Sequence, residues 1–210
     1  MVFTFPPFLR AWPITLAAVL LGLPAVAVAI PGDTGADTLR EEARTFLHRG
    51  RDYAENEQWQ AAIALYRNAI DINPRLADAH FLLGVAFAQQ DRPRDSVRAL
   101  KRAVQLDPQS ASAFYNLGVA YAYTGDMEKE MDAYKEAIRL DPKHISAHYN
   151  LATAYWAKGR DQEACRNLYE AGRLYDRAGN PKQAREMLYL IQRIAPESEY
   201  RSRLQKEVRD

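Results

Sequence analysis

The sequence predicts an all-α fold, an α-solenoid of stacked helix pairs, and three observations support that prediction. Prolines recur 34 residues apart, small and aromatic residues recur with the same period, and apolar residues between them follow the spacing of one helix face. The rows are the prolines Pro74, Pro108 and Pro142, the small residues Gly50, Gly84, Gly118 and Ala152, and the aromatic residues Tyr53, Phe87, Tyr121 and Tyr155. Independent rows that share one period indicate repeated structural units.

Each repeat is predicted to hold two antiparallel helices joined by a tight turn. In the third repeat, one helix face is formed by Phe114, Leu117, Gly118 and Tyr121. Gly125 and Asp126 interrupt this helix, and a second apolar stripe then runs to Pro142, which cannot donate the next backbone hydrogen bond. The small residues of the Gly118 row let the two helices approach closely. Glu130 occupies a row of otherwise small residues that is expected to face Gly118, so either Gly118 makes room for it or the helices splay.

The period divides the chain into four repeats, at residues 43–76, 77–110, 111–144 and 145–178. No proline closes the fourth repeat, so its second helix is predicted over residues 161–178. A second register places the same helix at the start of a displaced fifth repeat, residues 165–196, which a helix over residues 181–194 completes. The segment 197–210 is predicted to form a polar capping helix and a tail.

The first thirty residues are expected to lie outside the fold. Arg10 precedes an uncharged apolar run from Ala11 to Ile30, and the run ends in Ala27-Val28-Ala29, the layout of a secretory signal peptide. We expect residues 1–29 to be a cleaved signal; an uncleaved membrane anchor to about residue 30 is the alternative, because the run is just long enough to span a bilayer. Either way the repeats would be exported, to a periplasm, a lumen or the medium, or held on the non-cytoplasmic side of a membrane. Residues 30–42 are predicted to be a flexible lead-in.

These repeats resemble the tetratricopeptide repeat, whose 34-residue signature combines an aromatic residue, Leu-Gly, Tyr, alanines and a closing proline. The segment Ala113–Tyr121 matches it closely, and the resemblance covers roughly residues 43–196. It implies a right-handed superhelix whose first helices line a concave groove for peptides or proteins. Carried over by position, the implied peptide-binding residues are Phe81, Leu82, Val85, Tyr115, Asn116, Val119, Tyr149, Asn150 and Thr153, with Arg44, His48 and Arg51 at the groove entrance.

Asn116 and Asn150 occupy equivalent positions in adjacent repeats, and each side chain is able to donate and to accept a hydrogen bond. This pair is expected to hold an extended peptide by its backbone. Helix packing or solubility is the alternative explanation, because a Tyr-Asn-Leu sequence is common in the family.

Composition and motifs exclude several other functions. The 28 basic and 27 acidic residues lack the basic excess of a nucleic-acid binder, and Cys165 is the one cysteine, so no disulfide within the chain is expected. His144 and His148 are spaced for a metal, but no acidic residue or cysteine completes a site, and we expect no metal and no cofactor. No phosphate-binding glycine loop or nucleophile elbow is present, so no enzyme activity is expected.

We therefore expect an exported scaffold or assembly adaptor, a monomer that binds a protein or an extended peptide segment. Contact with a membrane is expected only if the N-terminal segment stays uncleaved. The alternatives are a structural protein that self-assembles or tethers a complex through the edges of its array, and a subunit of an enzyme complex.

Overall fold

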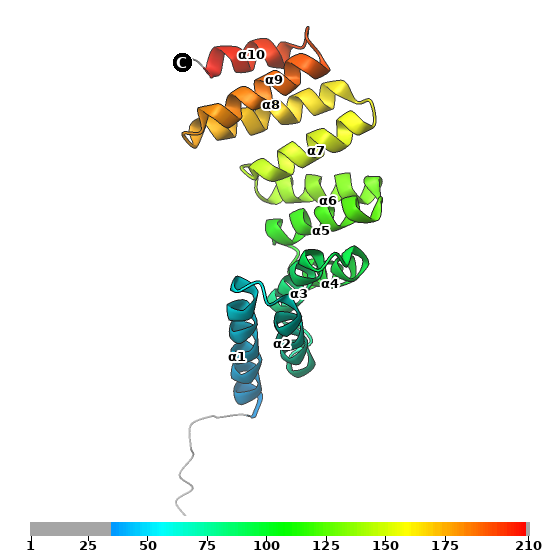
Figure 1. The fold of residues 1–210 in the computed structure, drawn as a ribbon, viewed down its shortest axis with the longest axis vertical. Coiled ribbons are helices and arrows are strands. Elements are labelled where there is room, and N and C mark those ends of the chain that lie inside the picture. Colours follow the sequence, from blue (N-terminus) through cyan, green and yellow to red (C-terminus); the bar gives the residue numbers. More distant parts are fainter. Residues whose placement is uncertain (1–34, 209–210) are drawn as a thin grey trace, which may run out of the picture.

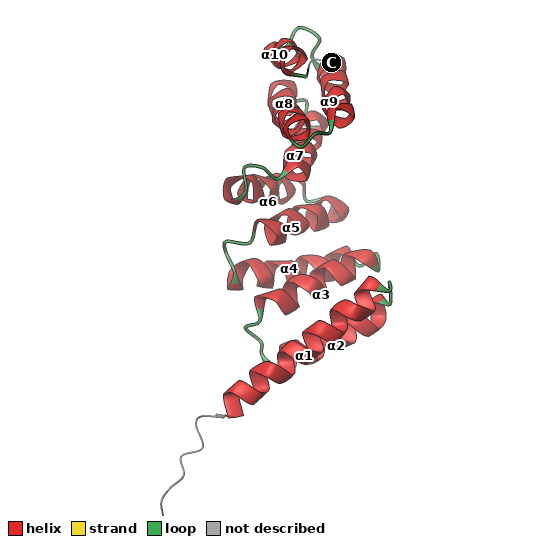
Figure 2. Ribbon diagram, turned by 90° about the vertical axis from the view of Figure 1, so that its left-hand side faces the viewer, coloured by secondary structure: helices red, strands yellow, loops and turns green. Residues whose placement is uncertain are grey.

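The computed structural model describes residues 35–208, and ten α-helices fill this range, with no strand among the described residues (Figures 1 and 2). Their bounds are α1 Gly35–Glu55, α2 Trp59–Ile72, α3 Ala77–Gln89, α4 Pro93–Leu106, α5 Ala111–Thr124, α6 Met127–Leu140, α7 Ile145–Ala157, α8 Asp161–Arg177, α9 Pro181–Ile194 and α10 Glu199–Glu207. The helices stack in chain order from α1 at one end to α10 at the other (Figure 1). The predicted fold class, an all-α stack of paired helices, is confirmed.

One turn type joins the two helices of each pair. A residue with a positive φ ends the first helix, and the next residue donates its backbone N–H to an aromatic residue five positions earlier. The positive-φ residues are Glu57, Asp91, Gly125, Gly159 and Gly179. The corresponding hydrogen bonds, of 2.9 to 3.1 Å, are Gln58 to Tyr53, Arg92 to Phe87, Asp126 to Tyr121, Arg160 to Tyr155 and Asn180 to Tyr175. The fifth turn joins α8 to α9, so these two helices are connected in the same way as the pairs before them.

α8 therefore belongs to two helix pairs. It packs extensively on α7 and equally on α9, and it also contacts α10. The link from α9 to α10 is of the between-pair kind: Ala195 donates its N–H to the Ile191 carbonyl, as Asn73 does to Ala69 after α2. Because α8 closes one pair and opens the next, α9 is the second helix of a pair at the point where a regular array would begin a new pair. This displacement of α9 creates the site described below.

The close approach within a pair is made between a glycine and a large ring. A Cβ atom placed on Gly118 would lie 2.5 Å from Cε1 and 2.6 Å from Cδ1 of Tyr134, a fully buried side chain of α6. The atoms nearest to such a Cβ belong to Tyr134, one turn further along α6, and not to Glu130. Glu130 is half-buried, and burial raises the pKa of its carboxyl group.

The N-terminal helix begins earlier than expected. The lead-in predicted over residues 30–42 is helical from Gly35 onward, because Ala36, Leu39 and the glutamates that follow favour a helix and Arg40 pairs with Asp37 at 3.0 Å. The predicted signal or anchor, residues 1–29, lies outside the described residues. Between residues 35 and 208, no helix combines the length and the apolar character needed to cross a bilayer.

The C-terminal helix α10 covers the end of the array. Leu204 is fully buried and lies against Gly172 of α8, where an added Cβ atom would come within 2.7 Å of it. Tyr169 of α8 donates a 2.7 Å hydrogen bond to Glu207, and its ring lies 5.7 Å from the ring of Tyr200. These contacts give an otherwise polar helix a fixed place on α8.

Candidate functional site

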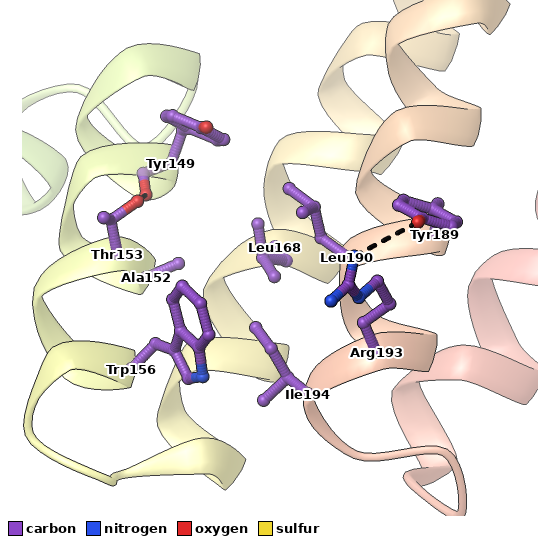
Figure 3. Close-up of a pocket in the computed structure, with 9 residues that line it drawn as sticks. All are labelled: Tyr149, Ala152, Thr153, Trp156, Leu168, Tyr189, Leu190, Arg193 and Ile194. Carbon is purple, nitrogen blue, oxygen red and sulfur yellow. Dashed lines mark hydrogen bonds between the residues drawn. The ribbon is translucent and has the colours of Figure 1, made fainter.

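The most distinctive surface of the described chain is an aromatic depression between α7 and α9 (Figure 3). It has a volume of about 280 Å³. α7 supplies one wall, α9 the other, and Leu168 of α8 lies between them. The lining consists of Tyr149, Ala152, Thr153, Trp156, Leu168, Tyr189, Leu190, Arg193 and Ile194.

A second depression of about 330 Å³ adjoins the first. It shares Tyr149, Tyr189 and Leu190 with the first and adds side chains from α8 and α9, namely Tyr175, Gln183, Glu186 and Met187. We call the two depressions together the α7–α9 groove. Its shared residues place an aromatic and aliphatic centre between two more polar ends.

Helical spacing explains why these side chains converge. On α7, the lining residues fall at i, i+3, i+4 and i+7, which is one helix face, from Tyr149 to Trp156. On α9, Tyr189 and Arg193 are one turn apart, as are Leu190 and Ile194. The two faces meet because α9 packs beside α8 as its second partner.

Several of the exposed large apolar side chains gather here. Within residues 35–208, six large hydrophobic residues are exposed, and three of them line the α7–α9 groove: Trp156 (57% exposed), Tyr189 (58%) and Tyr149 (39%). Exposed aromatic residues gathered in one depression mark a binding surface more often than isolated ones do. The chemistry of the groove is therefore that of recognition, with stacking and apolar contact as its main contributions.

Arg193 is the charged residue of the first depression. Its Nη1 donates to the hydroxyl oxygen of Tyr189 at 3.3 Å, drawn as the dashed line in Figure 3, and its guanidinium lies 5.9 Å from the centre of the same ring. The contact holds the cation over the mouth of the groove. No carboxylate within the described residues forms an ion pair with it.

The structure brings together only part of the predicted site. Tyr149 and Thr153 line the groove, and the Thr153 hydroxyl donates to the Tyr149 carbonyl at 3.1 Å. The apolar residues of the earlier repeats are half-buried instead, Val85 among them. Four of these residues also pack against core clusters, namely Phe81, Leu82, Tyr115 and Val119. The ring of Tyr115 lies 4.6 Å from that of His144, which fixes it between helices.

The two asparagines are partly committed to contacts within the chain. Asn116 donates Nδ2 to the carbonyl of Ser112 at 2.8 Å. Asn150 points Nδ2 at the hydroxyl oxygens of Tyr115 (3.4 Å) and Tyr134 (3.3 Å). Neither Oδ1 atom has a hydrogen-bond partner within residues 35–208, so each amide oxygen can accept a peptide N–H, and the second N–H of Asn116 can still donate. Their proposed role in holding a peptide stays a prediction.

The predicted groove entrance is less basic than its sequence indicates. Each of the three side chains lies near a carboxylate: Arg44 is 3.7 Å from Glu41, His48 is 3.5 Å from Asp52, and Arg51 is 3.5 Å from Asp78. These pairs reduce the local positive potential that an acidic ligand would meet.

His80, His144 and His148 have structural roles in the described chain. His144 caps α7 by accepting the Ala147 N–H on Nδ1 at 3.2 Å. His148 is buried, with its ring nitrogens 3.2 Å from the Asn167 Oδ1 and the Pro142 carbonyl, and His80 contacts the Pro74 carbonyl in the same manner. Across residues 35–208, no three histidine, cysteine or carboxylate side chains gather in a metal-binding arrangement.

Sequence reasoning missed the α9 wall and its floor, Leu168, Tyr189, Leu190, Arg193 and Ile194. A signal existed in the second register that shares the helix over residues 161–178, because that register predicts a helix at residues 181–194 beside it. Positions carried over from a regular 34-residue array do not include that helix.

Comparison with known proteins agrees with this architecture. Three family models match, described as TPR repeat over residues 50–91 and as tetratricopeptide repeat over residues 87–145 and 133–166; together they span more than half of the chain. No curated protein matches the chain.

Several solved structures share the fold. MamA residues 41 to the end from Desulfovibrio magneticus RS-1 is 22% identical, with a TM-score of 0.60 over 64% of this chain and 76% of that one. YrrB, described as a TPR protein with an unusual peptide-binding site, is 17% identical, with a TM-score of 0.57 over 82% of this chain and 96% of that one. The first TPR of Spaghetti (RPAP3), bound to the HSP90 peptide SRMEEVD, is 18% identical, with a TM-score of 0.56 over 57% of this chain and 94% of that one.

Proposed function

Because this chain belongs to the tetratricopeptide repeat proteins, which generally act as protein- or peptide-binding scaffolds, we propose that it holds a segment of a partner protein in the α7–α9 groove. The observation that carries the proposal is the gathering of three exposed aromatic side chains, Tyr149, Trp156 and Tyr189, around an apolar floor. Proteins of this family are typically non-catalytic, and the groove holds side chains suited to recognition.

Recognition here depends on a groove that exists before the ligand arrives. The lining side chains sit on helices whose backbones are fixed by packing on α8, so little of the receptor must be ordered on binding. The ligand still loses conformational freedom, and the combined depressions are small. We expect a modest affinity, with a Kd on the order of micromolar.

The cellular role that we propose is the assembly of an exported complex. The basic residue, apolar run and Ala27-Val28-Ala29 sequence before the repeats support export, and a scaffold placed outside the cytoplasm would hold components of an envelope or secreted assembly. Mass analysis of the mature chain tests this part. A mature chain that begins at Ile30 supports cleavage after Ala29, and a chain that retains the run while lying in the cytoplasm contradicts export.

Photocrosslinking in the producing cells tests the groove. A photoreactive amino acid at Thr153, an exposed residue that lines the first depression, should capture one partner segment that mass spectrometry identifies. The same probe at Tyr123, an exposed aromatic on α5 that lines none of the described depressions, is the matched control. The identified segment, made as a peptide, should bind the purified chain.

Two substitutions decide whether that binding uses the groove. Trp156→Ala and Tyr189→Ala each remove an exposed ring and should weaken peptide binding about tenfold or more, since stacked aromatic contacts dominate such interfaces. Tyr123→Ala should leave the Kd unchanged. Equal capture at both probe positions, or full affinity after both groove substitutions, contradicts the proposal.

A further inference from the structure

The α9 wall of the groove carries opposite charges at its two ends. Glu186 and Arg193 are seven residues apart, two helical turns, so they share a helix face and lie about 10.5 Å apart along the axis. Tyr189 and Leu190 lie between them, at i+3 and i+4. Arg193 lines the first depression and Glu186 the second.

Both charges are available to a ligand. Within the described residues, Arg193 has the Tyr189 hydroxyl as its polar partner and Glu186 forms no ion pair. The rest of the groove lining carries no Asp, Glu, Lys, Arg or His side chain. The groove thus has a positive end, an aromatic and aliphatic centre, and a negative end.

This pattern restricts the backbone of a ligand. An acidic and a basic side chain must lie about 10 Å apart on one side of it, with an apolar side chain between them. In an extended β-strand, same-side residues lie about 6.6 or 13 Å apart, which fits poorly. An α-helix also matches the spacing, through residues seven positions apart, so the choice between a helix and a polyproline II segment depends on the aromatic lining of the groove.

A polyproline II segment fits better. It rises about 3.1 Å per residue and repeats every three residues, so residues i and i+3 face the same way about 9 Å apart. Proline-rich segments dock into aromatic-lined grooves because their backbone is already ordered. Trp156, Tyr149 and Tyr189 supply such a lining.

We propose that the α7–α9 groove binds a proline-rich segment of the partner in the polyproline II conformation, with an acidic residue at Arg193 and a basic residue three positions away at Glu186. This inference rests on the proposed function and specifies its ligand. The guanidinium of Arg193 can pair with a carboxylate in a bidentate manner, and the carboxylate of Glu186 accepts from an ammonium or guanidinium group.

Isothermal titration calorimetry of the full chain with synthetic peptides tests the proposal. Two peptides have the charges in opposite order, Pro-Pro-Glu-Pro-Leu-Lys-Pro-Pro and Pro-Pro-Lys-Pro-Leu-Glu-Pro-Pro, and a third replaces both charged residues by glutamine. One of the two charged peptides should bind at least fivefold more tightly than the other charged peptide and than the neutral peptide. Added salt should reduce this difference in affinity.

Reversing the groove gives the sharper result. The double variant Glu186→Arg with Arg193→Glu keeps the net charge and should invert the preferred order of the peptides. Arg185→Glu, an exposed change next to Glu186 and outside the lining, should leave the order unchanged. Circular dichroism confirms that each variant keeps its melting temperature.

The two proposals fail in different ways. Equal binding of charged and neutral peptides, or a preference that the double variant does not invert, overturns the ligand assignment. If photocrosslinking at Thr153 still captures a segment whose binding requires Trp156, the proposed function stands without the polyproline II assignment. If no peptide binds and Thr153 captures nothing, both are overturned.

Discussion

Replacing Gly118 by alanine tests how the helix pairs are held together. Gly118 lies in the middle of α5, and its missing Cβ leaves space for the ring of Tyr134 on α6. The new methyl group would lie 2.5, 2.6 and 3.1 Å from three ring carbons. Tyr134 cannot easily retreat, because its side chain is 1% exposed and its hydroxyl lies 3.3 Å from the Asn150 amide.

Two effects of opposite sign decide the outcome. Alanine stabilises a helix interior by about 1 kcal/mol relative to glycine. Overpacking a well-filled core costs about 1–3 kcal/mol, and contacts with three ring atoms place this site in the upper part of that range. The net expectation is a loss of about 1–2 kcal/mol in the free energy of unfolding. For a chain of this size, that loss lowers the Tm by about 2–8 °C.

Thermal unfolding followed by circular dichroism measures this directly. Ala152→Gly in the equivalent position of α7 is the control, and it should lose stability through helix propensity alone. Adding Tyr134→Leu to Gly118→Ala should remove most of the overlap, since the fourth repeat already combines Ala152 with Leu168. A Tm for Gly118→Ala at or above that of the parent chain would show that the ring moves freely, and the close-approach argument would fail.

Three further outcomes are expected. Ser96→Ala should raise the free energy of unfolding by about 1 kcal/mol in a denaturant titration, because the buried Ser96 hydroxyl has no partner within the described residues and Ala62 fills the equivalent position; a loss of stability would contradict this. Burial raises the pKa of Glu130, so the stability associated with this group is full below its ordinary pKa and falls as the pH rises through the raised value. Glu130→Gln should therefore raise the Tm at pH 7 and change it little below about pH 4, and an equal gain at both pH values would rule out ionisation as the cause. Leu204→Ala should destabilise the docking of α10 by about 2–5 kcal/mol and speed labelling of Cys165, a buried thiol whose pKa is raised by burial; unchanged labelling would show that α10 does not protect it.

The fold could be predicted because the same local packing problem recurs along the chain. Each 34-residue repeat has a glycine or alanine opposite a large ring or a leucine, and most second helices are followed by a proline. These residues recur with one period although the residues between them differ. The start of α1 was harder, because Gly32, Gly35 and Pro31 resemble a flexible segment while the residues after Gly35 favour a helix. Local composition gave opposite indications within a few residues there.

The site was predicted only where it lies on the regular array. Tyr149 and Thr153 follow the 34-residue period and line the groove. Tyr115 and Phe81 have the same period, but neighbouring helices cover them, and periodicity alone does not say how far a ring is buried.

The other wall of the groove depends on a tertiary event. Tyr189 and Arg193 meet α7 only because α8 pairs with both of its neighbours, which displaces α9 from the position that a regular fifth repeat would give it. Similarly, the partner of Arg51, Asp78 on α3, becomes clear only when α3 is placed relative to α1. Spacing in one helix does not contain that information.

Amide chemical-shift mapping of the chain with its crosslinked partner segment tests the central claim most directly. The α7–α9 groove predicts that the largest shifts fall on α7 around Thr153 and Trp156 and on α9 around Tyr189 and Arg193, with little change at Tyr123. Shifts that cluster instead on α2 and α4, or that spread evenly over the array, would contradict the groove as the site where the partner is held.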